Sequence, residues 1–182
     1  MPEVDPSLDA RYLEIFPAYL RSLGADATAL GSVVTSDAPE GVRRYAIAGL
    51  NYIFKSLDLI PDGIDDLGFL DDAFVLRVAA SLALADSGGE AQPDPLSALA
   101  RDAEQIESFL GDVYPRLVNY VKNLLRGAAR GRTVDEVIAD AGVRDTFLHE
   151  VAAWAGDYQV PPFTRDVKTL IKLKAFLNAK LS

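Results

Sequence analysis

The segment from Lys55 to Arg77, KSLDLIPDGIDDLGFLDDAFVLR, constrains the fold more than any other part of the chain. It sets six aspartates among leucines, isoleucines and phenylalanines, namely Asp58, Asp62, Asp65, Asp66, Asp71 and Asp72. So many carboxylates cannot all be buried without partners, and so many apolar side chains are unfavourable in a solvated loop. We therefore expect a turn in this segment that is held against a hydrophobic core.

The first part of the segment is expected to break a helix. Pro61 lacks an amide donor and biases Ile60 towards extended backbone, while Gly63 can adopt a positive φ. Gly68 marks a second break, after which apolar residues recur at helical spacing. The predicted helix, Phe69 to Asp86, is apolar on most sides, which indicates a central position in the fold.

Asp71 and Asp72 fall in the first turn of that helix, where free amides and the helix dipole favour a carboxylate by about 0.3–1 kcal/mol. Asp72 also lies on an apolar stripe, so we expect it to be at least partly buried and to need a partner. We predict a structural clasp in which these two aspartates hold the preceding turn. Its residues are Asp58, Pro61, Asp62, Gly68, Asp71 and Asp72. Backbone amides of the turn, or Arg43 and Arg44 one helix upstream, are the expected partners.

The run LDLIPDGIDDLGFLDD resembles the signature of the YkvA-like bacterial domain family, a short helical domain without an established biochemical function. The matching positions are Asp58 to Asp62 and Leu67 to Asp72, with Phe69 in the place of the family's aromatic residue. Ser56, Gly63 and Asp65 depart from the pattern, since the family usually has proline, an aromatic residue and a second proline there. The resemblance covers about residues 46–82. Some relatives are membrane proteins, so the resemblance implies a membrane protein as an alternative, but the sequence of this chain argues against a membrane span.

The rest of the chain predicts an all-α multi-helix bundle of roughly seven to eight helices, because no alternating strand pattern of useful length occurs. A first helix is expected to end near Gly24, with Pro17 as a kink, and a second to cover Ala25–Ser36. Pro39 opens the next. Further stretches are expected to be helical after the central helix. One helix begins at Asp94, and the next covers Pro115–Arg126. A third begins at Thr133 with a capping box and stops at Gly142, and the last two helices of the chain cover Val143–Tyr158 and Thr164–Leu181.

The Gly- and Pro-containing run at 87–95 is the clearest linker. It divides a helical region, 1–86, from a C-terminal helical region, 96–182, and we expect the two to pack as one domain. Residues 1–114 carry 20 acidic and 7 basic side chains, whereas residues 115–182 carry 7 and 11. This distribution argues against binding of nucleic acid by the whole chain.

The 182-residue chain has no cysteine, which excludes disulfides and thiolate chemistry. No apolar run is long and uncharged enough for a membrane span, and the acidic N-terminus lacks the pattern of a secretion signal. We therefore expect a soluble, cytoplasmic protein. Its oligomeric state cannot be read from the sequence.

Asp62, Asp71 and Asp72 are the candidate ligands of a divalent cation, because Mg²⁺ and Ca²⁺ prefer carboxylate oxygens. The spacing fails the EF-hand pattern, since Phe69 or Ala73 stands where its final glutamate belongs. We favour the clasp over the cation site and expect no cofactor. A docking patch for proteins is a further alternative for the acidic cluster.

Other motifs are incomplete. His149 is the only histidine, and Ala153 stands where a zinc-protease helix needs its second ligand, so we expect a surface histidine. Glu104 and Glu107 lack the second half of a pyrophosphohydrolase motif. The run from Gly127 to Thr133 is one residue short of a phosphate-binding loop and follows a helix, which predicts a flexible interhelical turn.

Three functions remain. The favoured one is a non-enzymatic interaction or adaptor module that binds an unidentified protein partner. The first alternative is a Mg²⁺-dependent phosphate-ester hydrolase that uses the aspartate cluster, with Arg43 or Arg44 on the substrate. The second is a peripheral membrane protein that docks through its last helix, where Arg165, Lys168 and Lys172 lie opposite a face of apolar side chains. Those apolar side chains are Leu170, Leu173, Phe176 and Leu177.

Overall fold

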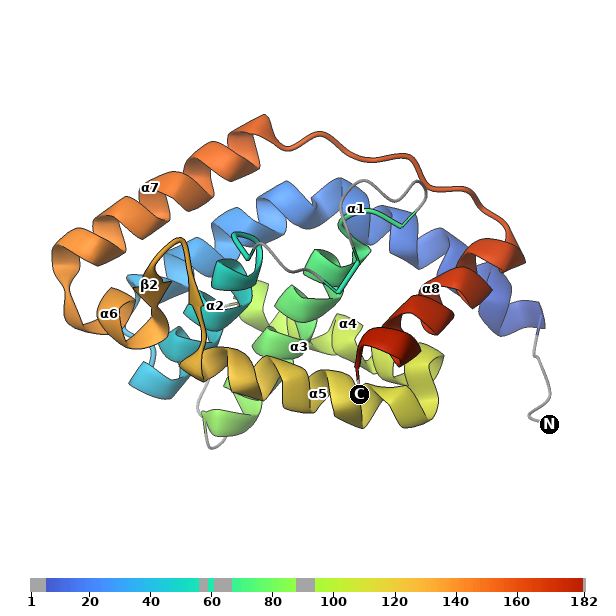
Figure 1. Cartoon of the computed structure of the whole chain (residues 1–182), viewed down its shortest axis with the longest axis horizontal. Helices are drawn as coiled ribbons and strands as arrows, with labels where there is room; N and C mark the ends of the chain where they lie inside the picture. The colour runs from blue at the N-terminus through green and yellow to red at the C-terminus, as the bar shows by residue number, and fades with distance from the viewer. Residues whose placement is uncertain (1–5, 56–58, 61–66, 88–93, 182) are drawn as a thin grey trace.

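The computed structural model describes residues 6–55, 59–60, 67–87 and 94–181 and confirms the all-α prediction. The α-helices in these ranges are α1 (Pro6–Val34), α2 (Glu40–Tyr52), α3 (Leu70–Asp86), α4 (Asp94–Leu110), α5 (Tyr114–Asn123), α6 (Val134–Ala139), α7 (Ala141–Asp157) and α8 (Val167–Lys180). Single 3₁₀ turns, η1 (Gly111–Val113) and η2 (Leu124–Arg126), flank α5. Strands β1 (Ala128–Ala129) and β2 (Arg132–Thr133) form a small antiparallel hairpin. Figure 1 shows how these elements are arranged.

Helix α3 is the centre of the bundle, as its sequence predicts. It begins at Leu70, with Phe69 as its cap residue, and packs against α1, α2, α4 and α5. Most of its side chains are buried, including those of Asp71, Asp72 and Arg77. A helix that is apolar on nearly all sides is stable in water only when other helices surround it, and Figure 1 shows α3 enclosed in this way.

One hydrophobic core joins the two halves of the chain. Buried side chains of α1, α2 and α3 contact those of α4 to α8 in a single cluster. Helix α7 lies along α1, and an extended segment from Tyr158 to Asp166 then crosses α1 towards α8 (Figure 1). Of the predicted linker at 87–95, residues 88–93 lie outside the described residues.

The predicted break near Gly24 is wrong, because α1 is continuous from Pro6 to Val34, with Pro17 inside it. Gly24 does not end the helix but allows α1 to pack closely against α7. A Cβ at this position would lie 3.3 Å from the carbonyl oxygen of Ala155 in α7. The glycine therefore allows two helix backbones to approach closely, and burial of α1 outweighs the low helix propensity of glycine.

The predicted helix stop at Gly142 is also wrong. Helix α6 ends at Ala139, and the carboxylate of Asp140 accepts hydrogen bonds from the backbone amides of Gly142 and Val143. Asp140 is thus the N-cap of α7, and Gly142 lies in its first turn. The expected N-cap of the preceding helix is present, since the Thr133 hydroxyl accepts a hydrogen bond from the Glu136 amide at 3.1 Å.

The β1–β2 hairpin was not predicted from the sequence. Its strands have two residues each, too short for an alternating pattern. Arg130 (φ 51°) and Gly131 (φ 75°) form its turn, and two consecutive positive φ values are what the tightest hairpin turns require. The run from Gly127 to Thr133 is therefore an ordered hairpin, where the sequence predicted a flexible turn.

We expect Gly49→Ala to destabilise the protein by about 1–3 kcal/mol, because it overpacks the contact between α2 and α3. A Cβ at Gly49 would lie 3.0 Å from the Cβ of Ala79 and 3.4 Å from Leu76. The matched control is Gly31→Ala in α1, where the new Cβ would meet its nearest side chain at 3.7 Å. Because alanine has the higher helix propensity, this control should stabilise by up to about 1 kcal/mol. Urea denaturation measures both changes, and equal effects would contradict the packing described for Gly49.

Candidate functional site

The N-terminus of α3 is fixed by packing rather than by a side-chain cap. Phe69 adopts a left-handed conformation (φ 67°) and makes no capping hydrogen bond. Its ring centroid lies 6.3 Å from that of Trp154 and 5.5 Å from that of Tyr158, at the end of α7. A left-handed non-glycine residue is unfavourable and persists when its surroundings hold it. The sequence placed the break at Gly68, one residue earlier.

Asp71 is fully buried and binds the backbone that precedes α3. Its Oδ2 accepts a hydrogen bond from the Tyr52 hydroxyl at 2.5 Å and from the Ile60 amide at 3.4 Å. The same hydroxyl accepts a hydrogen bond from the Leu59 amide at 2.7 Å. Tyr52 therefore connects α2, the turn at residues 59–60 and the first turn of α3. Burial, followed by the Asp71 charge, raises the pKa of Tyr52 well above its usual value.

Asp72 faces the other side of the same turn and is 2% exposed. It lies close enough to Tyr158 to help raise the pKa of that phenol, after burial as the larger cause. The Tyr158 hydroxyl donates a hydrogen bond to the Leu20 carbonyl of α1 at 2.7 Å. The Asp72 charge also helps to raise the pKa of Tyr52, so both aspartates act on the α2 tyrosine, and Asp72 acts in addition on Tyr158 at the end of α7.

The arginines that the sequence offered as partners have their described contacts elsewhere. The Arg43 Nε donates to the Ala38 carbonyl at 3.0 Å, and Arg44 forms ion pairs with Asp135 and Glu40. Asp58, Pro61 and Asp62 of the predicted clasp lie outside the described residues. In the described part of the clasp, the contacts to Asp71 come from a tyrosine and a backbone amide. Sequence reasoning missed Tyr52, because no spacing rule relates it to an aspartate 19 residues later.

Arg77 forms a second buried polar cluster, which sequence reasoning also missed. It is 2% exposed, and its Nη2 and Nε lie 3.0 Å from Asp26 and 3.1 Å from Asp102. Its guanidinium carbon is 3.8 Å from the ring centre of Tyr19. One side chain of α3 thereby binds α1 and α4 together. The sequence did contain a signal for this cluster, because an arginine on a helix that is apolar on most sides must be buried with partners.

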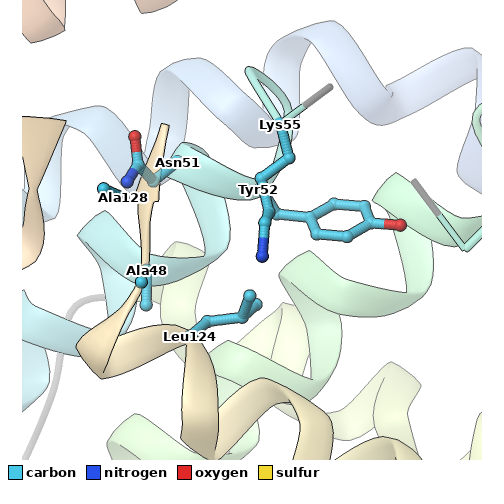
Figure 2. A pocket seen from close by; sticks show the side chains of 7 residues that line it. Ala48, Asn51, Tyr52, Lys55, Leu124 and Ala128 are labelled. Atoms are coloured by element: carbon cyan, nitrogen blue, oxygen red, sulfur yellow. The ribbon is translucent and has the colours of Figure 1, made fainter. Parts of the chain in front are cut away.

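Asp71, Asp72 and Arg77 are each at most 2% exposed. A small hollow beside Tyr52, lined by Ala48, Asn51, Lys55 and Leu124 among others, has no room for a water-sized body. Figure 2 shows the Tyr52 ring extending away from this hollow, with its hydroxyl towards α3. No group of three or more acidic or histidine side chains within the described ranges could hold a metal ion. Since Asp62 is outside those ranges, the predicted cation site is not described as a whole.

Among the described residues, an open concave surface lies between α1 and the C-terminal half of α7. A hollow of about 450 Å³ is bordered by small side chains of both helices, with Tyr158 and Val160 at its end. A second hollow of about 230 Å³ continues it along the extended segment, beside Pro161 and Phe163. Arg21 lines both. We call this surface the α1–α7 groove.

The remaining candidates are spread over the surface. His149 is exposed on α7, as expected, and Glu104 and Glu107 are exposed on α4. Arg116 bonds to the backbone carbonyls of Asn178 and Leu181 at the end of α8.

No protein-family model, curated protein or solved structure matches the chain. The resemblance of Asp58–Asp72 to the YkvA-like signature therefore stays a prediction.

We expect Tyr52→Phe to lower the free energy of unfolding by about 1–3 kcal/mol, because it removes a donor to buried Asp71 and an acceptor of the Leu59 amide without changing the ring. Tyr45→Phe, on the same helix and half-buried, is the matched control and should change stability by less than about 0.5 kcal/mol. Chemical denaturation followed by circular dichroism measures both. A Tyr52→Phe protein as stable as the control would contradict the bond network described for Asp71.

We also expect a loss of stability in alkali. The pKa values of Tyr19, Tyr52 and Tyr158 are raised in the folded protein, with burial as the largest cause in each. In the unfolded chain these phenols ionise near about pH 10, so above that pH the unfolded state releases protons that the folded state keeps. Their contribution to stability is complete below about pH 10 and falls as the pH rises further. Tyrosinate absorbance and helical circular dichroism should therefore change together, whereas full ionisation in an intact fold would contradict the burial.

Proposed function

We propose that this protein is a non-enzymatic helical interaction module whose partner binds the α1–α7 groove. The proposal rests on where the charged side chains and the open surface lie in the fold. Asp71, which the sequence singled out, and Arg77, which it did not, are both engaged inside the fold. The α1–α7 groove is instead lined mostly by small and apolar side chains, with Arg21 and Arg165 as its charged residues.

The groove has features of a peptide-binding surface. Gly24, Ala25 and Thr28 of α1 line the groove together with Ala152 and Ala155 of α7. The two helices are in close contact at Gly24 and Ala155, so the groove runs over this contact, and its small side chains leave space there for a partner. Apolar clefts with a few polar groups at their edges are the usual form of such sites. The exposed Arg21, which borders both hollows, supplies a cation for an acidic residue of the partner.

The geometry favours the two alternatives less. A phosphate-ester hydrolase would need Asp71 and Asp72 on an accessible cleft, but both are at most 2% exposed. Membrane docking through α8 was expected to use its apolar face, but Leu170, Leu173 and Leu177 of that face are buried in the core. No helix in the described parts of the chain is long and apolar enough to cross a bilayer.

The proposal is tested by photo-crosslinking in the native cell. A benzophenone amino acid at Ala25 or Ala152, both exposed in the groove, should give one specific protein adduct. The same amino acid at Ala175, exposed on α8, is the control and should not give it. Ala152→Trp, which fills the groove at a solvent-exposed position, should reduce capture of the same partner about tenfold or more.

Two results would overturn the proposal. One is an identical set of adducts from the groove and from Ala175. The other is metal-dependent turnover of a phosphorylated substrate together with a melting temperature that rises in Mg²⁺ or Mn²⁺, which would restore the hydrolase hypothesis.

A further inference from the structure

The β1–β2 hairpin holds two arginines against aromatic rings. The guanidinium carbon of Arg130 lies 4.5 Å from the ring centre of Phe54, and that of Arg132 lies 5.3 Å from the ring centre of Phe147. The backbone of Arg132 is also fixed, since its carbonyl accepts a hydrogen bond from the Asn51 amide group at 3.3 Å. Stacking of this kind holds a guanidinium in one plane and does not use the hydrogen-bond donors along its edge.

The positive charge of the pair is only half compensated by its described ion pairs. Glu150 of α7 pairs with Nη1 of Arg132 and lies 3.5 Å from Nη1 of Arg130. One carboxylate therefore serves two guanidinium groups.

Arg132 has further unused donors. Its side chain is only 11% exposed, and its Nε and Nη2 are buried without a hydrogen-bond partner. These two nitrogens form one of the two paired-donor faces of a guanidinium, and Nη2 belongs to both faces. A buried donor without a partner is unfavourable, so a pair of them calls for an occupant.

The turn itself is unfavourable for arginine. Arg130 has a φ of 51°, a conformation in which asparagine or glycine is preferred. The chain therefore places a second cation beside Arg132 at some cost in backbone energy. Such local strain occurs most often where a residue serves binding.

We propose that the hairpin is an oxyanion site, in which a phosphate or carboxylate group binds Arg130 and Arg132 and replaces Glu150. Both groups have two oxygens that match the paired donors of arginine. Glu150 is 35% exposed and Arg130 is 55% exposed, so the rim of the site can move while Arg132 stays between its rings. Glu150 is then a built-in competitor that occupies the site until an oxyanion binds.

The test is an NMR titration of the full-length chain with sodium phosphate, and separately with sodium acetate, at constant ionic strength kept with sodium chloride. The Nε–H signal of Arg132 should shift and saturate with at least one of the two anions, and the anion that acts identifies the source of the oxyanion. Glu150→Gln should tighten binding by about tenfold or more, because it removes the competing charge.

Two variants distinguish binding by the paired donors of Arg132 from simple charge attraction. Arg132→Lys keeps the charge but lacks paired donors, so it should lose binding while remaining folded. Arg126→Gln removes an exposed charge at the end of η2, just before the hairpin, and should bind phosphate or acetate as the wild type does. The proposal is overturned if neither anion gives a saturable shift in the wild type and in Glu150→Gln, or if Arg132→Lys binds as tightly as the wild type.

Discussion

A carboxylate without access to water must receive hydrogen bonds from its neighbours, and this requirement organises the protein around Asp71. Two of its donors are the Tyr52 hydroxyl and the Ile60 amide. Tyr52 can serve only if the end of α2 lies against the first turn of α3, and Ile60 only if the chain before α3 folds back onto it. The hydrogen bonds to the Asp71 carboxylate therefore fix the relative positions of α2, residues 59–60 and α3.

Arg77 applies the same constraint one and a half turns further along α3. Its bonds to Asp26 and Asp102 require α1 and α4 to approach α3 from either side. Buried ion pairs add little net stability, because desolvation offsets much of their attraction, but an alternative packing that separates the charges is heavily penalised. The apolar side chains of α3 supply the driving force for burial, and Asp71 and Arg77 select one arrangement of the helices. Because these charges are engaged inside the fold, we propose the α1–α7 groove and the hairpin, among the described residues, as the surfaces that bind partners.

The sequence predicted the helical class, the position of α3 and the burial of Asp72, since all three follow from local spacing of apolar residues. The continuity of α1 could not be predicted, because Gly24 is explained by the backbone of Ala155, which is distant in sequence. The same holds for the candidate site. Asp71 was identified from its place in a helix turn, but its partner Tyr52 depends on how two helices pack. The role proposed for Arg132 could likewise not be predicted, because it depends on Phe147 and Glu150, which only the fold brings beside the hairpin.

The central claim is that Asp71 and Tyr52 act on each other inside the fold, and a double-mutant cycle measures this directly. The free energies of unfolding of Tyr52→Phe, Asp71→Asn and the combined variant are compared with that of the wild type. The account predicts a coupling energy of about 1 kcal/mol or more, because each substitution removes the same hydrogen bond. Additivity within about 0.3 kcal/mol would show that the two side chains are independent and would contradict the account.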